Sequence, residues 1–162
     1  MKTLIILRHG KAELYRFDLD DFDRKLADRG RKNATDMGKF ISEMSGKPDL
    51  ILSSDAKRTQ ETAQLAAEGL NYPISEILYD NELYLTPSYI ISKVLSSIDD
   101  SVNSCLLVGH NPGLTDLIND LGVRLDNLPT GSAVCFSFNC DSWDKISAKK
   151  ARFEWIKLAR KL

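Results

Sequence analysis

The sequence predicts a single-domain α/β three-layer sandwich, in which helices flank both faces of a mixed, mostly parallel central sheet. Three short apolar runs, at residues 4–7, 50–52 and 105–108, each end abruptly in polar or glycine residues. This pattern is typical of buried strands that are followed by turns. Segments with helical spacing fill the intervals between the runs, and such alternation favours a parallel sheet that is covered on both faces.

Four segments have the apolar spacing of amphipathic helices. In residues 37–44 and 114–121 the apolar side chains recur at i, i+3, i+4 and i+7, which predicts helices after the first and third strands. The apolar positions in residues 59–70 and 90–98 predict two further helices between them.

Two more strands are predicted near the end of the chain. Val134, Phe136 and Phe138 alternate with smaller residues, and Phe153 and Trp155 alternate with charged ones. We expect one of these two strands to run antiparallel at an edge of the sheet. No repeat, low-complexity tract or linker interrupts the sequence, so residues 1–162 are predicted to form one domain.

The composition argues against nucleic-acid and membrane partners. The chain has 22 Lys and Arg against 23 Asp and Glu, so no overall positive field attracts nucleic acid. The first apolar run is too short for a signal peptide or a membrane span, and we expect a cytoplasmic protein. We expect a solvated loop at a short acidic segment, which contains Asp18, Asp20, Asp21 and Asp23. A helix start and a loop are predicted at Asp28, Arg29 and Gly30.

The residues that follow the predicted strands are suited to chemistry. The two histidines of the chain, His9 and His110, each stand beside a glycine after a strand. Arg8 and Arg58 follow the first and second strands. Ligands of open α/β sheets bind outside the carboxyl ends of the strands, so we expect these four side chains to converge. Two imidazoles and two guanidiniums at one edge predict a site for a dianionic phosphoryl group.

Each residue type has a role in phosphoryl chemistry. The guanidinium group of arginine is always charged and pairs with two phosphate oxygens at once. A neutral imidazole, with a pKa of ~6.5, can attack phosphorus and carry the phosphoryl group covalently. Gly10 is expected to turn the backbone tightly under the phosphate and to leave its N–H within reach. Asn111 is expected to cap a helix whose first N–H groups face the anion.

Four segments resemble signature segments of the histidine phosphatase superfamily, also called the phosphoglycerate mutase-like family. Its three main segments are similar to LRHG at residues 7–10, SSDAKRTQET at residues 53–62 and GHNPG at residues 109–113. The D-x-x-R-x-L-x-x-x-G segment of its short, SixA-like branch resembles residues 21–30. The set is a specific signal because all segments occur in this order and after these strands.

The resemblance implies a phosphatase that works through a covalent phosphohistidine intermediate. By position, His9 falls on the nucleophile of the family and His110 on its second catalytic histidine. Arg8 and Arg58 fall on the arginines that bind phosphate. A phosphoglycerate mutase-like fold is implied, with no metal and no cofactor. SixA-like members act on phosphohistidine, so the expected partner is a phosphorylated protein, such as a phosphorelay histidine domain, or else a small phosphorylated molecule.

The leaving group distinguishes two kinds of substrate. Many members that cleave phosphate esters protonate the leaving oxygen with a carboxylic acid, for which Glu82 and Asp80 are the candidates here. An alkoxide, whose conjugate acid has a pKa of roughly 15.7, leaves poorly without such an acid. A phosphohistidine ring, with a pKa of ~6.5, can leave as neutral imidazole. We therefore expect a site without a strong acid to prefer P–N bonds.

Two other functions remain open on the sequence alone. A broad phosphatase for small molecules would use the same four side chains on phosphate esters. A non-catalytic module would capture a phosphorylated partner with the same cationic cluster but would not turn it over. A phosphoryl adduct on His9 would distinguish an enzyme from such a module.

Overall fold

Six strands form one sheet in the computed structural model, which describes residues 1–162. The strands are β1 (Lys2–Arg8), β2 (Leu50–Ser53), β3 (Leu78–Tyr79), β4 (Ser104–Gly109), β5 (Ala133–Phe138) and β6 (Ala151–Lys157). Their order across the sheet is β3-β2-β4-β1-β5-β6. The first four of these pair in parallel, whereas β5 runs antiparallel to both β1 and β6. The expected mixed, mostly parallel sheet is confirmed.

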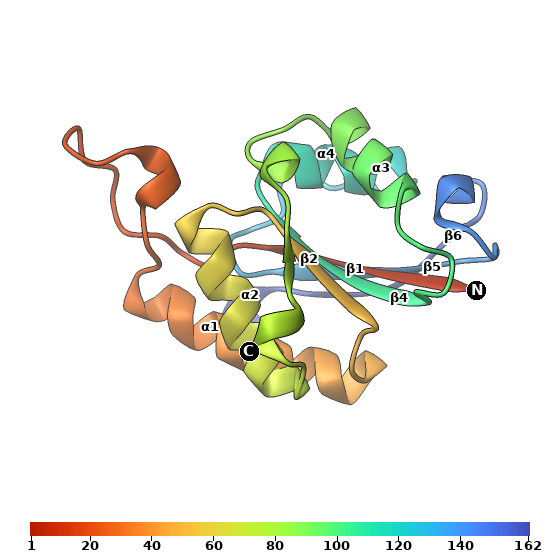
Figure 1. Cartoon of the computed structure of the whole chain (residues 1–162), viewed down its shortest axis with the longest axis horizontal. Coiled ribbons are helices and arrows are strands. Elements are labelled where there is room, and N and C mark those ends of the chain that lie inside the picture. The colour runs from red at the N-terminus through yellow and green to blue at the C-terminus, as the bar shows by residue number, and fades with distance from the viewer.

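Four α-helices cover the two faces of the sheet, as predicted. They are α1 (Asp28–Ser45), α2 (Lys57–Leu70), α3 (Ser88–Ser96) and α4 (Gly113–Asp120). Figure 1 shows α1 and α2 below the sheet and α3 and α4 above it. No helix has both the length and the apolar character that are needed to span a membrane.

The side chains in the continuous apolar run of β1 belong to two hydrophobic cores, one on each face of the sheet. Leu4 and Ile6 belong to the core on the side of α3 and α4, whereas Ile5 and Leu7 belong to the core on the side of α1 and α2. Successive side chains of a strand point to opposite faces, so a strand covered on both faces needs apolar residues at every position. All four side chains are at most 1% exposed.

The position of the antiparallel strand differs from the expectation. The reversed strand is β5, and it lies inside the sheet because β6 pairs along its outer side. The edge strand β6 runs in the same direction as β1. The opposite edge is β3, which the apolar pattern does not predict because its two residues, Leu78 and Tyr79, are exposed.

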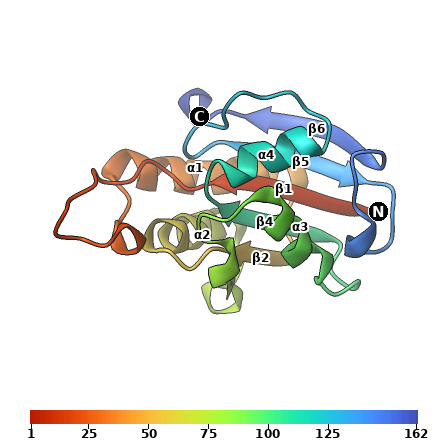
Figure 2. The ribbon, with the colours of Figure 1, turned by 90° about the horizontal axis from the view of Figure 1, so that it is seen from above.

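The parallel strands β1, β2 and β4 end at a common edge of the sheet. Arg8 at the end of β1 pairs with Gly109 at the end of β4, and Ser53 at the end of β2 pairs with Val108. The segments that follow these strands therefore begin side by side. Figure 2 shows the segment between β1 and α1 projecting beyond this edge.

Candidate active site

The structure brings the four predicted side chains together at this edge. Arg8, His9, Arg58 and His110 all line one cavity of about 420 Å³. The ring centroids of His9 and His110 are 5.4 Å apart. Both histidines and Arg58 are buried, with exposed fractions of 7%, 3% and 2%. The cavity thus places two imidazoles and two guanidiniums around a space that solvent reaches.

His9 follows β1 directly, and its ring is held in one orientation. Its Nδ1 atom lies 2.7 Å from the carbonyl oxygen of Gly10. Because a carbonyl oxygen only accepts, Nδ1 carries the proton and Nε2 keeps a free electron pair. Burial, followed by the charges of Arg58, Arg8 and Arg24, lowers the pKa of His9 to about 3, although the hydrogen bond to Gly10 opposes this shift. The ring is therefore neutral near pH 7.

Gly10 has a different role from the expected one. Its N–H donates to the Thr62 hydroxyl at 3.1 Å, so the expectation that this N–H faces a phosphate is wrong. A Cβ atom at Gly10 would lie 2.6 Å from the carbonyl oxygen of Gly30. Gly30 lies inside α1 and not in a loop. The two glycines are needed because the segment after β1 crosses the first turn of α1 in direct backbone contact.

His110 follows β4, and its ring contacts a serine that directly follows β2. Its Nε2 lies 2.8 Å from the Ser54 hydroxyl, whose oxygen also accepts the N–H of Ala56 at 3.4 Å. When the hydroxyl donates to Nε2, the ring proton lies on Nδ1, the nitrogen that has no hydrogen-bond partner within the protein. Burial, together with His9 and Arg58, lowers the pKa of His110 to about 3.

The segment after β4 also positions Arg8. The Arg8 Nη1 and the Asn111 Nδ2 both donate to the carbonyl oxygen of Leu128, each at 3.0 Å. Asn111 Oδ1 accepts the N–H of Thr115 in the first turn of α4 at 3.1 Å. The Asn111 side chain therefore accepts an N–H of the first turn of α4, as expected of a cap, although Pro112 occupies the N-cap position. Asn111 also holds the Leu128 carbonyl, to which Arg8 donates.

Asp21 does not lie in a solvated loop, so the expectation for the acidic segment is wrong at this residue. Asp21 begins a short 3-10 helix, η1 (Asp21–Asp23), and lines the cavity. Arg58 donates from Nη1 to the Asp21 carbonyl at 2.8 Å and from Nη2 to Oδ2 at 3.0 Å. Tyr84 donates to Oδ2 at 2.6 Å, and Arg24 Nη2 donates to Oδ1 at 3.1 Å. Sequence reasoning missed Asp21, Arg24 and Tyr84, although two of them belong to the D-x-x-R pattern.

Unpartnered donors are concentrated in this cavity. Four buried side-chain polar atoms of the chain have no hydrogen-bond partner within the protein: Arg8 Nε, Arg24 Nε, Arg58 Nε and His110 Nδ1. All four belong to residues that line the cavity. Buried donors normally have acceptors, because an unsatisfied group costs ~1–3 kcal/mol. A ligand rich in acceptor oxygens, such as a phosphoryl group, would satisfy them.

The candidate acids Glu82 and Asp80 are not brought to the cavity. Glu82 lies on the 3-10 helix η3 (Asn81–Leu83) with its side chain exposed. Its N–H donates to Asp80 Oδ1 at 2.9 Å. Neither residue lines the cavity, whereas Leu85, a few residues later, does.

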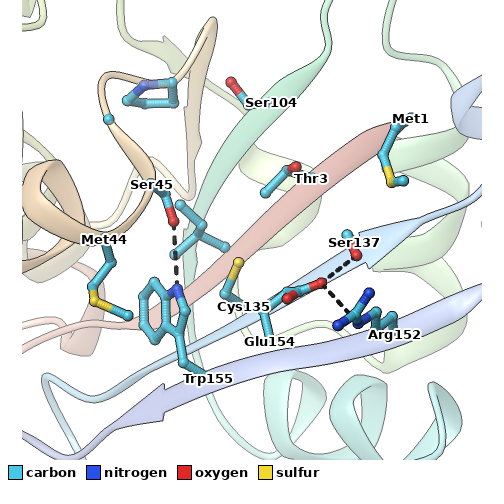
Figure 3. Close-up of a pocket in the computed structure, with 13 residues that line it drawn as sticks. Met1, Thr3, Met44, Ser45, Ser104, Cys135, Ser137, Arg152, Glu154 and Trp155 are labelled. Atoms are coloured by element: carbon cyan, nitrogen blue, oxygen red, sulfur yellow. Dashed lines mark hydrogen bonds and ion pairs between the residues drawn. The ribbon is translucent and has the colours of Figure 1, made fainter.

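A second cavity, of about 480 Å³, lies at the other end of the strands, near the first residues of β1 and β4. Figure 3 shows the Trp155 indole N–H pointing to Ser45, at 3.4 Å, and Glu154 beside Ser137 and Arg152. Its arginine is already paired with a carboxylate, and no histidine lines it. Groups of three or more His, Cys, Asp and Glu side chains that could hold a metal ion are absent from the chain.

Comparison with known proteins identifies the family of the chain. Residues 4–83 match the histidine phosphatase superfamily (branch 1). An uncharacterised protein of Mycobacterium leprae is 30% identical over 112 residues, which are 67% of this chain and 66% of the relative. The structure assigned as phosphohistidine phosphatase SixA from Agrobacterium tumefaciens is 26% identical, with a TM-score of 0.81 over 96% of this chain and 97% of that one. The protein histidine phosphatase SixA complexed with tungstate has the same fold, with a TM-score of 0.81 and 21% identity over 98% of this chain and 97% of that one. The chain therefore belongs to the histidine phosphatase superfamily and is a member of its SixA-like branch.

Proposed function

We propose that the protein is a phosphatase that removes the phosphoryl group from phosphohistidine in proteins, through a covalent intermediate on His9. Membership of the superfamily supports phosphatase activity. The observation that carries the proposal is the set of four unpartnered nitrogen atoms on residues that line the same cavity as His9. The similarity to SixA supports the choice of phosphohistidine as the substrate.

Transfer begins at His9 Nε2, whose electron pair attacks the phosphorus of the substrate. The P–N bond of the substrate breaks, and its electron pair stays on the ring nitrogen of the leaving imidazole. Arg8 and Arg58 stabilise the charge on the three phosphoryl oxygens. His110 donates its Nδ1–H to the same group. His9 then carries the phosphoryl group on Nε2 while Nδ1–H still donates to Gly10.

Water attacks the phosphorus of this intermediate in the second step. The P–N bond to His9 breaks, and its electron pair returns to Nε2. The attacking water supplies the oxygen of inorganic phosphate, and its protons leave with the phosphate. His9 is thereby restored to its initial neutral form, and the two steps add up to hydrolysis.

The absence of an acid at the cavity supports phosphohistidine over small phosphate esters, which are the second candidate. Glu82 and Asp80 do not line the cavity, and the pKa of Asp21 is below its usual range. A leaving alkoxide, whose conjugate acid has a pKa of roughly 15.7, would find no protonated carboxyl group there. An imidazole with a pKa of ~6.5 needs no such acid, because a ring that is already protonated on its other nitrogen leaves as neutral imidazole. We also propose that the reaction needs no metal ion and that the protein acts in the cytoplasm.

The test is to mix the protein with a phosphohistidine peptide and to analyse it by mass spectrometry. We expect an acid-labile phosphoryl adduct on His9 in the wild type and none in His9→Gln. Binding of the peptide without adduct or turnover would show a non-catalytic module. Equal rates on the peptide and on a sugar phosphate would show a broad phosphatase. The metal chelator EDTA is expected to leave the rate unchanged.

A further inference from the structure

We propose that Asp21 recognises the leaving nitrogen base of the substrate, and that this contact makes the site selective for P–N over P–O bonds. The proposal rests on the proposed function, because it assigns the substrate class of the same cavity. The substrate class is a phosphoramidate whose leaving base carries an N–H group, of which phosphohistidine is one.

The carboxylate of Asp21 has acceptor capacity left. It accepts three side-chain hydrogen bonds, one from Arg24 on Oδ1 and two on Oδ2, from Arg58 and Tyr84. A carboxylate offers about four acceptor positions, so Oδ1 can accept one more donor. The side chain is 31% exposed and faces the cavity. A donor on a bound substrate can therefore reach it.

An ionised carboxylate among phosphate-binding arginines requires an explanation. Burial raises the pKa of Asp21, but the hydrogen bond from Tyr84 and the charge and hydrogen bond of Arg58 outweigh it, so that the net pKa is lowered. A negative charge at this place repels a phosphoryl dianion. A phosphate ester adds to this repulsion, because its leaving oxygen has electron pairs but no hydrogen that could be donated to the carboxylate. A protonated imidazole next to the phosphoryl group brings both a positive charge and an N–H, which match the carboxylate.

The contact fits the bond changes of the first step. The leaving ring is protonated on the nitrogen that is not bound to phosphorus, and this N–H donates to Asp21. When the P–N bond breaks, its electron pair remains on the other ring nitrogen. The ring leaves as neutral imidazole and retains its N–H. Asp21 stays ionised throughout, so it orients and stabilises the leaving base without transferring a proton.

The charged and titratable groups that face Asp21 determine what the pH dependence of kcat/KM reports. They are Arg24 on its own segment, Arg58 on α2, Tyr84 after η3, His110 after β4, and Arg8, His9 and Lys11 at the end of β1. The pKa of Tyr84 is raised to about 12 by burial and by its hydrogen bond to Asp21, and both histidines have a pKa of about 3. The arginines stay charged at all working pH values. Between pH 5 and 9, roughly the range around an imidazole pKa of ~6.5, the substrate ring titrates together with the phosphoryl group, whose second pKa is about 6. Because a P–O substrate carries the same phosphoryl group, a change that only the phosphohistidine substrate shows reports the ring.

The experiment compares Asp21→Asn with wild type on a phosphohistidine peptide and on 4-nitrophenyl phosphate, a P–O substrate. We expect the ratio of kcat/KM values for the two substrates to fall about tenfold to a hundredfold, as for loss of one hydrogen bond to a charged group. The alkaline limb of the pH profile should move to lower pH for the peptide only, because the carboxylate no longer raises the pKa of the bound ring.

The matched control is Asp20→Asn, which removes a negative charge from an exposed neighbour whose N-cap role asparagine can also fill. Its ratio should stay at the wild-type value. Equal losses on both substrates in Asp21→Asn, or an unmoved pH limb, would show that Asp21 only holds Arg58 and would overturn the inference. A wild-type protein inactive on both substrates would instead refute the proposed function.

Discussion

Gly10 and Gly30 meet backbone to backbone, at a separation that leaves no room for a side chain on either residue. A Cβ atom at Gly30 would overlap the carbonyl group of Lys11. We therefore expect Gly30→Ala to lower the free energy of unfolding by about 1–3 kcal/mol, the range for overpacking of a buried contact. Urea unfolding measures this loss. The control is Arg29→Ala, an exposed position on the same helix, and equal midpoints for the two variants would contradict the close packing.

Arg58 and His110 are each expected to stabilise the transferring phosphoryl group. Loss of one such contact in Arg58→Ala or His110→Ala should reduce kcat on a phosphohistidine peptide roughly a hundred- to thousandfold, or by ~2.7–4 kcal/mol. His9→Ala should abolish turnover. Arg124→Ala, at an exposed position that does not line the cavity, serves as the control. Ordinary activity in His9→Ala would refute the mechanism.

The two buried histidines should make stability depend on pH. Their pKa values fall from 6.5 to about 3 in the folded protein, chiefly through burial. Between these values the unfolded chain binds more protons than the folded one, so the free energy of unfolding decreases as the pH falls. The stabilisation is complete above pH 6.5 and is lost toward pH 3. Urea unfolding at a series of pH values should give a smaller slope for His110→Gln than for wild type, and identical slopes would count against the assignment.

Thr62 couples the nucleophile segment to α2. Its hydroxyl accepts the N–H of Gly10 at 3.1 Å and donates to the carbonyl of Arg58 at 2.8 Å. Thr62→Val keeps the shape but leaves a buried N–H without an acceptor, which should cost about 1–3 kcal/mol of stability. Thr62→Ser retains the hydroxyl and should lose less. Chemical denaturation of both variants tests the ranking, and the reverse order would show that packing of the methyl group dominates.

Glu82 is expected to be dispensable for phosphohistidine hydrolysis. The side chain is exposed and does not line the cavity, so Glu82→Gln should change kcat/KM by no more than about twofold, as for surface substitutions. Steady-state kinetics on a phosphohistidine peptide provide the measurement. A loss of roughly a hundredfold, the size of a general-acid contribution, would mean that this carboxylate reaches the substrate.

The ends of the strands could be predicted because two local signals agree there. A continuous apolar run marks a buried strand, and the charged or glycine residue after it marks the edge where parallel strands end. The convergence of Arg8, His9, Arg58 and His110 follows from this rule, and the segment resemblance adds the role of each side chain. Their burial and orientation required the folded structure, because they depend on contacts such as Ser54 with His110.

The contribution of Asp21 could not be predicted from polarity alone. A run of aspartates is typical of a solvated loop, and only the approach of η1 to α2 places one of them on Arg58. Tyr84 carries no periodic or charge pattern, so its hydrogen bond to Asp21 has no sequence signal. Glu82 is a candidate acid only through the resemblance to family members that cleave phosphate esters, and η3 directs the chain so that Leu85 lines the cavity instead.

The central position of β1 has a consequence for folding during synthesis. Its two neighbours are β4 and β5, in registers that join Thr3 to Ser104 and Lys2 to Phe138. The strand that His9 follows is thus translated well before either of the strands that pair with it. Contacts so distant in sequence slow folding and leave an apolar strand open to aggregation or chaperones on the ribosome. The catalytic edge is therefore assembled only after β4 and β5 have emerged.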